Sequence, residues 1–205
     1  MVNLTRIYTR TGDDGTTSLG DFSRTGKNDP RLVAYADTDE ANSAIGVVLA
    51  LRGDQATGLD DAMRTVLQRV QNDLFDVGAD LCVPLTATPA HPPLRITDAY
   101  VEDLEAACDT FNADLAPLRS FILPGGTMAA AQLHIARTVT RRAERAVWAA
   151  VEAHGTGPEG GVNPLTGRYL NRLSDLLFIL CRCANGAAGD VLWVPGGGRA
   201  QPPDA

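Results

Sequence analysis

Aromatic residues are scarce in this sequence of 205 residues, at 5%, whereas hydrophobic residues as a whole make up 44%. A core of this composition is built mainly from Ala, Leu, Val and Ile, which favours packed helices over an aromatic-rich β-sandwich. The length is sufficient for one substantial core and does not demand a second domain. We therefore expect one domain with two mobile ends.

Long apolar runs and an excess of positive charge are also missing. No stretch approaches the roughly 20 uncharged apolar residues that span a bilayer, and residues 1–10 lack the apolar core of a signal peptide. The 18 basic residues are outnumbered by 25 acidic ones, which gives a formal net charge of -7. General binding to nucleic acid or to an acidic membrane is therefore not expected. We expect a soluble, cytoplasmic protein that holds any anion with a local basic cluster.

Cysteine and histidine are few, and neither residue type shows the spacing of metal ligands. Cys82 and Cys108 lie far apart, while Cys181 and Cys183 are two residues apart in a helical pattern and so point to different sides. We expect reduced cysteines that serve packing, in keeping with an intracellular setting. A zinc site is not expected.

Apolar residues recur at helical spacing in five stretches that Gly- and Pro-rich breaks separate. The stretches cover approximately residues 32–52, 59–81, 97–111, 127–153 and 167–184. In the second stretch, successive core positions from Val66 to Leu81 follow at intervals of three or four, as one face of an amphipathic helix requires. Five helices joined by short breaks predict an all-α fold, a five-helix antiparallel bundle.

The two ends of the chain have a different composition. Residues 1–30 are polar and rich in turn-forming residues, which predicts an irregular loop with room for a short strand. The end, which contains Val191-Leu192-Trp193 followed by three glycines, predicts an extended tail. We assign residues 1–185 to a single helical-bundle domain that includes the 1–30 loop, and residues 186–205 to a flexible C-terminal tail.

The fourth stretch carries four arginines within about two helical turns. Arg137, Arg141 and Arg145 are spaced by four residues with Arg142 beside them, and His134 precedes them, off the predicted apolar stripe. Guanidinium groups this close repel one another unless they bind anions, and one guanidinium can bind two phosphate oxygens at once. A polyphosphate is the sharpest candidate ligand. The alternative is a solvated basic face whose partners are acidic residues of the same helix.

A second candidate is the polar segment from Thr9 to Thr17. Its glycines would let backbone N–H groups approach a phosphate closely, and its threonine hydroxyls can donate further hydrogen bonds. Asp13 could meet a magnesium ion through water, because that ion keeps part of its hydration shell. The spacing of a Walker loop is absent, and an ordinary turn-rich segment is the alternative interpretation.

The third candidate is Asn171, which emerges between core leucines of the last stretch together with Arg172 and Asp175. Asparagine is a mediocre helix former, so its presence in a helix needs a local reason. A site residue and an ordinary interhelical hydrogen bond both satisfy that need.

Read together, these segments resemble the PduO-type ATP:cob(I)alamin adenosyltransferases over nearly the whole chain, from about Ile7 to Asn185. The resemblance rests on six motifs, which are Tyr8 to Asp13, Asp37 to Gly46, Phe121 to Gly126, His134 to Thr138, Arg141 to Arg145 and Tyr169 to Asp175. Several separate motifs in the same order are hard to obtain by chance.

The resemblance implies an enzyme that transfers the 5'-deoxyadenosyl group of ATP to cob(I)alamin, forming adenosylcobalamin and releasing triphosphate. It also implies a homotrimer with active sites between subunits, where the 1–30 loop of one subunit, as the nucleotide-binding loop, meets the arginine helix. MgATP is then the co-substrate and cob(I)alamin the acceptor. The ATP-binding residues carried over are Thr9, Arg10, Thr11, Gly12, Thr17, Ser18, Lys27, Arg137, Arg141, Arg142, Glu144, Arg145 and Asn171.

The resemblance implies roles for two further residues, Asp39 and Phe121. An ion pair across the subunit interface joins Asp39 to Arg137. Phe121 lies on the corrinoid side and helps to displace the lower axial ligand, so that a four-coordinate cobalt becomes easier to reduce. Arg137, Arg141, Asp39 and Phe121 form the expected catalytic set.

One departure from the family pattern affects the loop. Many members have Lys where this chain has Asp14, so a phosphate contact is lost or is replaced by a contact through metal. We expect the triphosphate to carry most of the Mg2+, with Asp13 or Asp14 reaching it through water.

A corrinoid reductase and an adenosylcobalamin-dependent mutase are the expected partners. The leading alternative function is a noncatalytic corrinoid carrier that delivers its cargo to such a mutase. A helical interaction module with a surface arginine patch is the second.

Overall fold

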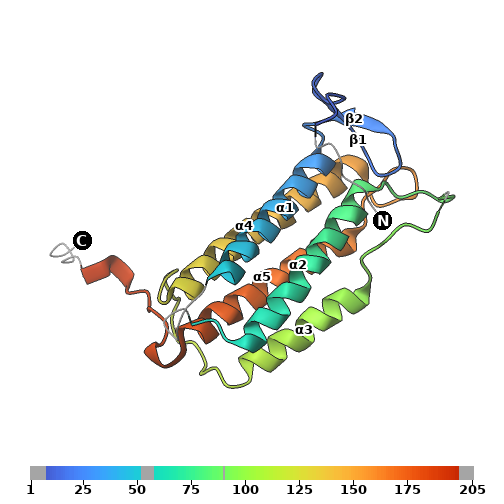
Figure 1. Cartoon of the computed structure of the whole chain (residues 1–205). Helices are drawn as coiled ribbons and strands as arrows, with labels where there is room; N and C mark the ends of the chain where they lie inside the picture. The colour runs from blue at the N-terminus through green and yellow to red at the C-terminus, as the bar shows by residue number, and fades with distance from the viewer. Residues whose placement is uncertain (1–7, 52–57, 90, 199–205) are drawn as a thin grey trace, which may run out of the picture.

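The computed structural model describes residues 8–51, 58–89 and 91–198 of the chain. These residues form five long α-helices, which confirms the predicted all-α bundle (Figure 1). The helices are α1 (Pro30–Ala50), α2 (Asp61–Cys82), α3 (Asp98–Asn112), α4 (Met128–His154) and α5 (Pro164–Asn185). No helix within the described ranges is long and apolar enough to cross a membrane.

The helices begin where a capping side chain can accept a backbone hydrogen bond. The Asp29 carboxylate accepts from the N–H of Arg31 at 2.8 Å, and the Thr127 hydroxyl accepts from the N–H of Ala130 at 3.1 Å. Helix α5 begins earlier than the expected residue 167 because Asn163 caps it and Pro164 occupies its first turn. The predicted helices are otherwise confirmed to within two residues at each end.

Helix α4 packs along both α1 and α5, while α2 packs against α1, and α3 against α5. Five alanines on the buried side of α4 let its neighbours approach closely; they are Ala129, Ala130, Ala136, Ala143 and Ala150. Tyr169 is the one aromatic side chain among the buried core residues of the described ranges. The core is therefore aliphatic, as the composition predicts.

The N-terminal loop contains a small antiparallel hairpin, with β1 (Thr16–Ser18) paired to β2 (Arg24–Gly26). It sits at the end of the bundle where α1 begins and α4 ends (Figure 1). The carboxylate of Asp29 ties it there, because it accepts from the Thr25 hydroxyl at 3.0 Å and contacts Nε2 of His154 at 2.9 Å. The sequence predicts an irregular loop with at most a short strand, and the structure has two short strands there.

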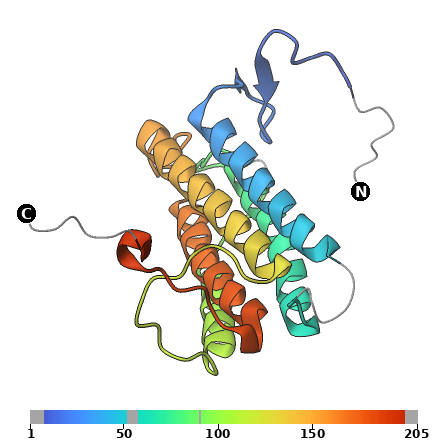
Figure 2. The same cartoon turned by 90° about the vertical axis from the view of Figure 1, so that its left-hand side faces the viewer.

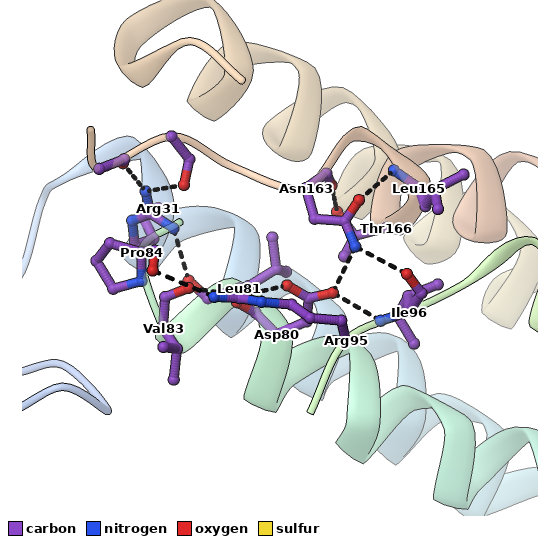
Figure 3. A network of polar contacts seen from close by, with 12 residues as sticks. Arg31, Asp80, Leu81, Val83, Pro84, Arg95, Ile96, Asn163, Leu165 and Thr166 are labelled. Atoms are coloured by element: carbon purple, nitrogen blue, oxygen red, sulfur yellow. Dashed lines mark hydrogen bonds and ion pairs between the residues drawn. The ribbon is translucent and has the colours of Figure 1, made fainter. Parts of the chain in front are cut away.

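A buried polar network lies at the same end of the bundle (Figure 3). The guanidinium of Arg31 donates to the carbonyl oxygens of Leu81, Gly160 and Gly161 at 2.6 to 3.0 Å. Beside it, the Asp80 carboxylate pairs with Arg95 at 2.6 Å. Since Asp80 is 1% exposed and fully paired, the network fastens the loops on which the hairpin rests.

The C-terminal segment follows α5 at the opposite end of the bundle and contains two short turns, η2 (Gly186–Ala188) and η3 (Pro195–Gly198) (Figure 2). Between them the chain pairs with the segment before α4. The N–H of Leu123 donates to the carbonyl of Val191 at 2.7 Å, and the N–H of Trp193 donates to that of Phe121 at 2.8 Å. The flexibility expected for residues 186–205 stays a prediction.

Candidate functional site

A cavity of about 790 Å3 opens between the segment before α4, the helices α4 and α5, and the C-terminal segment. Its lining is largely aromatic and aliphatic, with a few polar groups. The lining residues are Leu118, Arg119, Ser120, Phe121, Ile122, His134, Arg137, Phe178, Trp193 and Pro195. An apolar cavity with few polar groups is typical of a site for a large, mostly apolar ligand.

Phe121, predicted as the corrinoid-side residue, stands at this cavity with 78% of its surface exposed. The indole of Trp193 packs edge-on against its ring, with centroids 6.0 Å apart and planes at 69°. The backbone pairing of the two segments fixes this contact. The sequence predicts Trp193 as part of a tail, and the structure makes it a wall of the same cavity.

The four arginines of α4 differ in their surroundings. Arg137 is half-buried in the cavity wall, and its Nε has no hydrogen-bond partner within the described residues. Arg141 and Arg145 are exposed, and in the same part of the chain no ion pair engages them. Arg142 instead contacts Glu40 and, at 3.4 Å, Asp37 of α1.

The pairing of Arg142 has an electrostatic consequence and a structural one. Its hydrogen bond to Glu40 raises the pKa of the guanidinium above its ordinary value, so the group stays charged. Within one chain it joins α4 to α1. Its assigned contact with ATP stays a prediction, which requires the guanidinium to exchange a carboxylate for a phosphate or to hold both.

Glu144 and Asn171, both predicted ATP-binding residues, meet across α4 and α5. The Asn171 amide donates to Oε1 of Glu144 at 3.0 Å, and the same oxygen accepts from the Trp148 indole at 3.4 Å. The interhelical hydrogen bond that the sequence left open is therefore present. It fixes the carboxylate one turn beyond Arg141.

The predicted nucleotide-binding loop is organised by a residue that the sequence interpretation missed. The guanidinium of Arg24 donates to the carbonyl of Thr11 at 2.9 Å, contacts the hydroxyl of Thr16 and lies 3.6 Å from the Asp14 carboxylate. Thr16 donates to Asp14 from its hydroxyl at 2.7 Å and from its N–H at 3.0 Å. The side-chain hydrogen bond, first of all, lowers the pKa of Asp14.

Several predicted loop residues come together around Gly12. The hydroxyls of Thr9 and Thr11 lie 3.0 Å apart. A Cβ on Gly12 would stand 2.9 Å from the carbonyl of Thr16 and 3.2 Å from the Nζ of Lys27, so the lysine ammonium lies directly over the glycine. Thr17 and Ser18 belong to β1, and Arg10 adopts a left-handed backbone with φ of 64°.

Asp13 and Asp14, the two residues predicted to reach Mg2+ through water, differ in their interactions. The carboxylate of Asp14 is occupied by Thr16 and Arg24, whereas no interaction engages that of Asp13 within the described ranges. Those ranges also hold no group of three or more His, Cys, Asp or Glu side chains placed to bind a metal. A contact of Asp13 or Asp14 with Mg2+ through water stays a prediction.

In one chain the N-terminal loop and Arg137 do not form a single site. The loop is tied to His154 at the end of α4, and Arg137 precedes that residue by roughly 25 Å at the rise of an α-helix. Asp39 and Arg137 are likewise separate, because Asp39 lines a small groove between α1 and α2 while Arg137 faces the cavity beside α5. Their predicted ion pair therefore needs two chains.

His134 corrects the sequence interpretation, which left it off the apolar stripe. The side chain is buried, with 3% of its surface exposed, because α5 and the segment before α4 cover that side of the helix. Its ring lies 6.4 Å from that of Phe178, edge to face. Burial, and then the nearby charge of Arg137, lower the pKa of His134.

Comparison with known proteins shows the family of the chain. Residues 7–184 match the sequence model of the cobalamin adenosyltransferases. A corrinoid adenosyltransferase of Mycobacterium tuberculosis is 62% identical over 97% of both chains, and the corrinoid adenosyltransferase PduO of Salmonella typhimurium is 41% identical over 89% of this chain and 50% of its own.

Solved structures agree as well. A variant PduO-type ATP:corrinoid adenosyltransferase from Lactobacillus reuteri, complexed with cobalamin and ATP, superposes with a TM-score of 0.80. It is 34% identical, and the match covers 92% of this chain and 99% of that one. The aromatic cavity, the arginine row and the threonine-rich loop thus occur in a chain that belongs to the cobalamin adenosyltransferase family.

Proposed function

We propose that this protein transfers the 5'-deoxyadenosyl group of ATP to cob(I)alamin, forming adenosylcobalamin and releasing triphosphate. Its relatives are named corrinoid adenosyltransferases, and a similar structure holds both cobalamin and ATP. One observation carries the proposal for this chain. Arg137 belongs both to the wall of the aromatic cavity and to the arginine row of α4, so one helix joins a corrinoid site to a phosphate site.

The chemistry needs no base from the protein. The electron pair of Co(I) attacks C5' of ATP and forms the cobalt–carbon bond, while the C5'–O bond breaks and its electrons leave with the triphosphate. Co(I) is a strong nucleophile, so the protein has to align the cobalt with C5' and to stabilise the charge on the leaving oxygen. Arg137, Arg141 and Lys27 supply positive charge for the second task.

Aromatic side chains control the cobalt. Phe121 and Trp193 present two rings at the cavity, 6.0 Å apart. Rings held at the lower face of the corrin exclude an axial ligand, and a cobalt without that ligand is easier to reduce to Co(I). Phe121 is the residue proposed to carry this effect, with Trp193 as its support.

The active site is proposed to lie between subunits of a homotrimer. Within one chain the loop is tied to His154, which lies roughly 25 Å along α4 from Arg137, and Asp39 lies on another side of the bundle. A cyclic assembly would bring the loop of one copy to the arginine row of the next, with Asp39 meeting the Arg137 of a neighbour. Three equivalent sites follow from such a ring.

We place the reaction in the cytoplasm, next to a corrinoid reductase that supplies Co(I) and a mutase that consumes adenosylcobalamin. All four cysteines, Cys82, Cys108, Cys181 and Cys183, are free thiols, which fits a reducing compartment.

An anaerobic spectral assay tests the proposal. Protein is mixed with chemically reduced cob(I)alamin and MgATP, and the loss of cob(I)alamin absorbance is compared with the triphosphate released. The proposal requires light-sensitive adenosylcobalamin and triphosphate in equal amounts. Corrinoid binding without triphosphate release would instead identify a noncatalytic carrier.

A further inference from the structure

His134 is a buried side chain whose hydrogen-bonding groups are unused within the described residues. Its exposed fraction is 3%, and neither Nδ1 nor Nε2 has a partner there. Leaving a buried polar group unpaired destabilises the folded chain. A histidine kept at that cost is expected to have a partner that the chain itself does not supply.

The place of His134 indicates where that partner lies. The side chain lines the aromatic cavity one helical turn before Arg137, whose Nε is the other unpaired buried atom of the same lining. The ring of Phe178 packs edge-on against the imidazole and limits its rotation. Two neighbouring side chains thus bring unused polar groups to a cavity that is otherwise mostly apolar.

The surroundings keep the imidazole neutral. Arg137 on α4 and Arg119 from the preceding segment add positive charge to the cavity, and Cys181 of α5 is an uncharged thiol whose pKa burial raises to about 12. Asp190 of the C-terminal segment is engaged by Arg182 at 2.9 Å. Burial and Arg137 lower the pKa of His134, so at neutral pH it offers one N–H donor and one acceptor nitrogen.

We infer, on the basis of the proposed function, that His134 binds a primary carboxamide on the rim of the corrin ring. A carboxamide carries an acceptor oxygen and a donor NH2, which complement the donor and the acceptor of a neutral imidazole. The bond positions the corrin against the aromatic pair and beside Arg137. His134 is therefore a corrinoid-binding residue that sets where the cobalt stands.

Two substitutions separate this role from a structural one. His134→Leu removes both hydrogen-bonding groups, while His134→Gln keeps a donor and an acceptor without charge. Dissociation constants for cob(II)alamin and for ATP are measured by spectral titration and calorimetry, together with the melting temperature. His91→Leu, at an exposed position outside the cavity, is the matched control.

The expected result is a cobalamin affinity about tenfold weaker in His134→Leu, with unchanged ATP affinity and an equal or higher melting temperature. His134→Gln should retain the affinity to within about threefold. The inference is overturned if His134→Leu binds cobalamin like wild type, if ATP binding weakens as much, or if affinity and stability fall together in both variants. A wild-type protein that binds no cobalamin would overturn the proposed function as well.

Discussion

The four arginines of α4 differ in what their side chains contact. Arg137 enters the cavity wall, Arg142 turns to the carboxylates of α1, and Arg141 and Arg145 reach solvent. The helical spacing predicts the cluster but not this division, which depends on where α1 and α5 pack. Arg141 is the most direct test of phosphate binding, since replacing it removes no hydrogen bond or ion pair within the described residues.

Arg141→Ala should lower kcat by about 100- to 1000-fold, because a guanidinium beside the leaving triphosphate stabilises the transition state by about 3–4 kcal/mol. The melting temperature should not change. Steady-state kinetics with cob(I)alamin and MgATP measure the effect. Arg168→Ala, which removes an exposed ion pair with Asp98, is the control and should keep wild-type turnover. Equal turnover in both variants would refute the phosphate-binding role.

Buried thiols make stability depend on pH. Burial raises the pKa of Cys181 to about 12 and that of Cys108 to about 11, from 9.0. Above pH 9 the unfolded chain releases thiol protons that the folded chain retains. The free energy of unfolding should therefore fall as pH rises from 9, by at most about 1.4 kcal/mol per pH unit for each thiol.

Denaturant titrations at pH 8, 9 and 10 test this on wild type and Cys181→Ala. The variant lacks the most deeply buried thiol, so its stability should fall less steeply above pH 9. Identical slopes for the two proteins would show that Cys181 keeps an ordinary pKa in the fold.

At the scale of the element, local sequence signals predict where the helices lie. They do not predict the long-range bonds that join one element to another. The apolar spacing from Val66 to Leu81 predicts α2, because helical spacing and capping depend only on residues that are close in the sequence. The bonds of Arg31 to Gly160 and Gly161 join positions 129 and 130 residues apart, which no local pattern reveals. Arg24 was missed for a similar reason, since its partners become neighbours only when the hairpin forms.

The burial of His134 has the same origin. One turn of α4 at this position faces α5 and the segment before α4, so a residue beside the apolar stripe becomes covered. Helical periodicity shows which positions of a helix are apolar. It does not show whether a buried imidazole has a hydrogen-bond partner. Glu144 and Asn171, on two different helices, do meet, while their assigned contact with ATP stays a prediction.

The hairpin yields a prediction at this scale. Arg24→Ala removes the bond to Thr11 and the ion pair with Asp14, so the loop loses order that ATP binding must then restore. The KM for ATP should rise about tenfold while cobalamin affinity stays the same. Arg69→Ala, which affects an exposed ion pair between α2 and α3, should change neither. An unaltered KM in Arg24→Ala would show that the loop needs no such support.

At the scale of the whole molecule, each chain carries both halves of the proposed site and keeps them apart. The hairpin stands over the end of α4 (Figure 1). The aromatic cavity lies toward the start of the same helix, where it is lined by His134 and Arg137. Rearranging one chain to unite them would break the ties of Asp29 to Thr25 and His154. A neighbouring copy can supply the missing half without that cost.

Complementation between two inactive variants tests this central claim most directly. Lys27→Ala damages the loop and Arg141→Ala damages the arginine row, so either variant alone should have low turnover. Co-expressed chains that mix at random would form sites with both intact halves at about one interface in four. Anaerobic turnover of the mixed protein should then reach about a quarter of wild type, whereas turnover no higher than that of the separate variants would contradict a site shared between subunits.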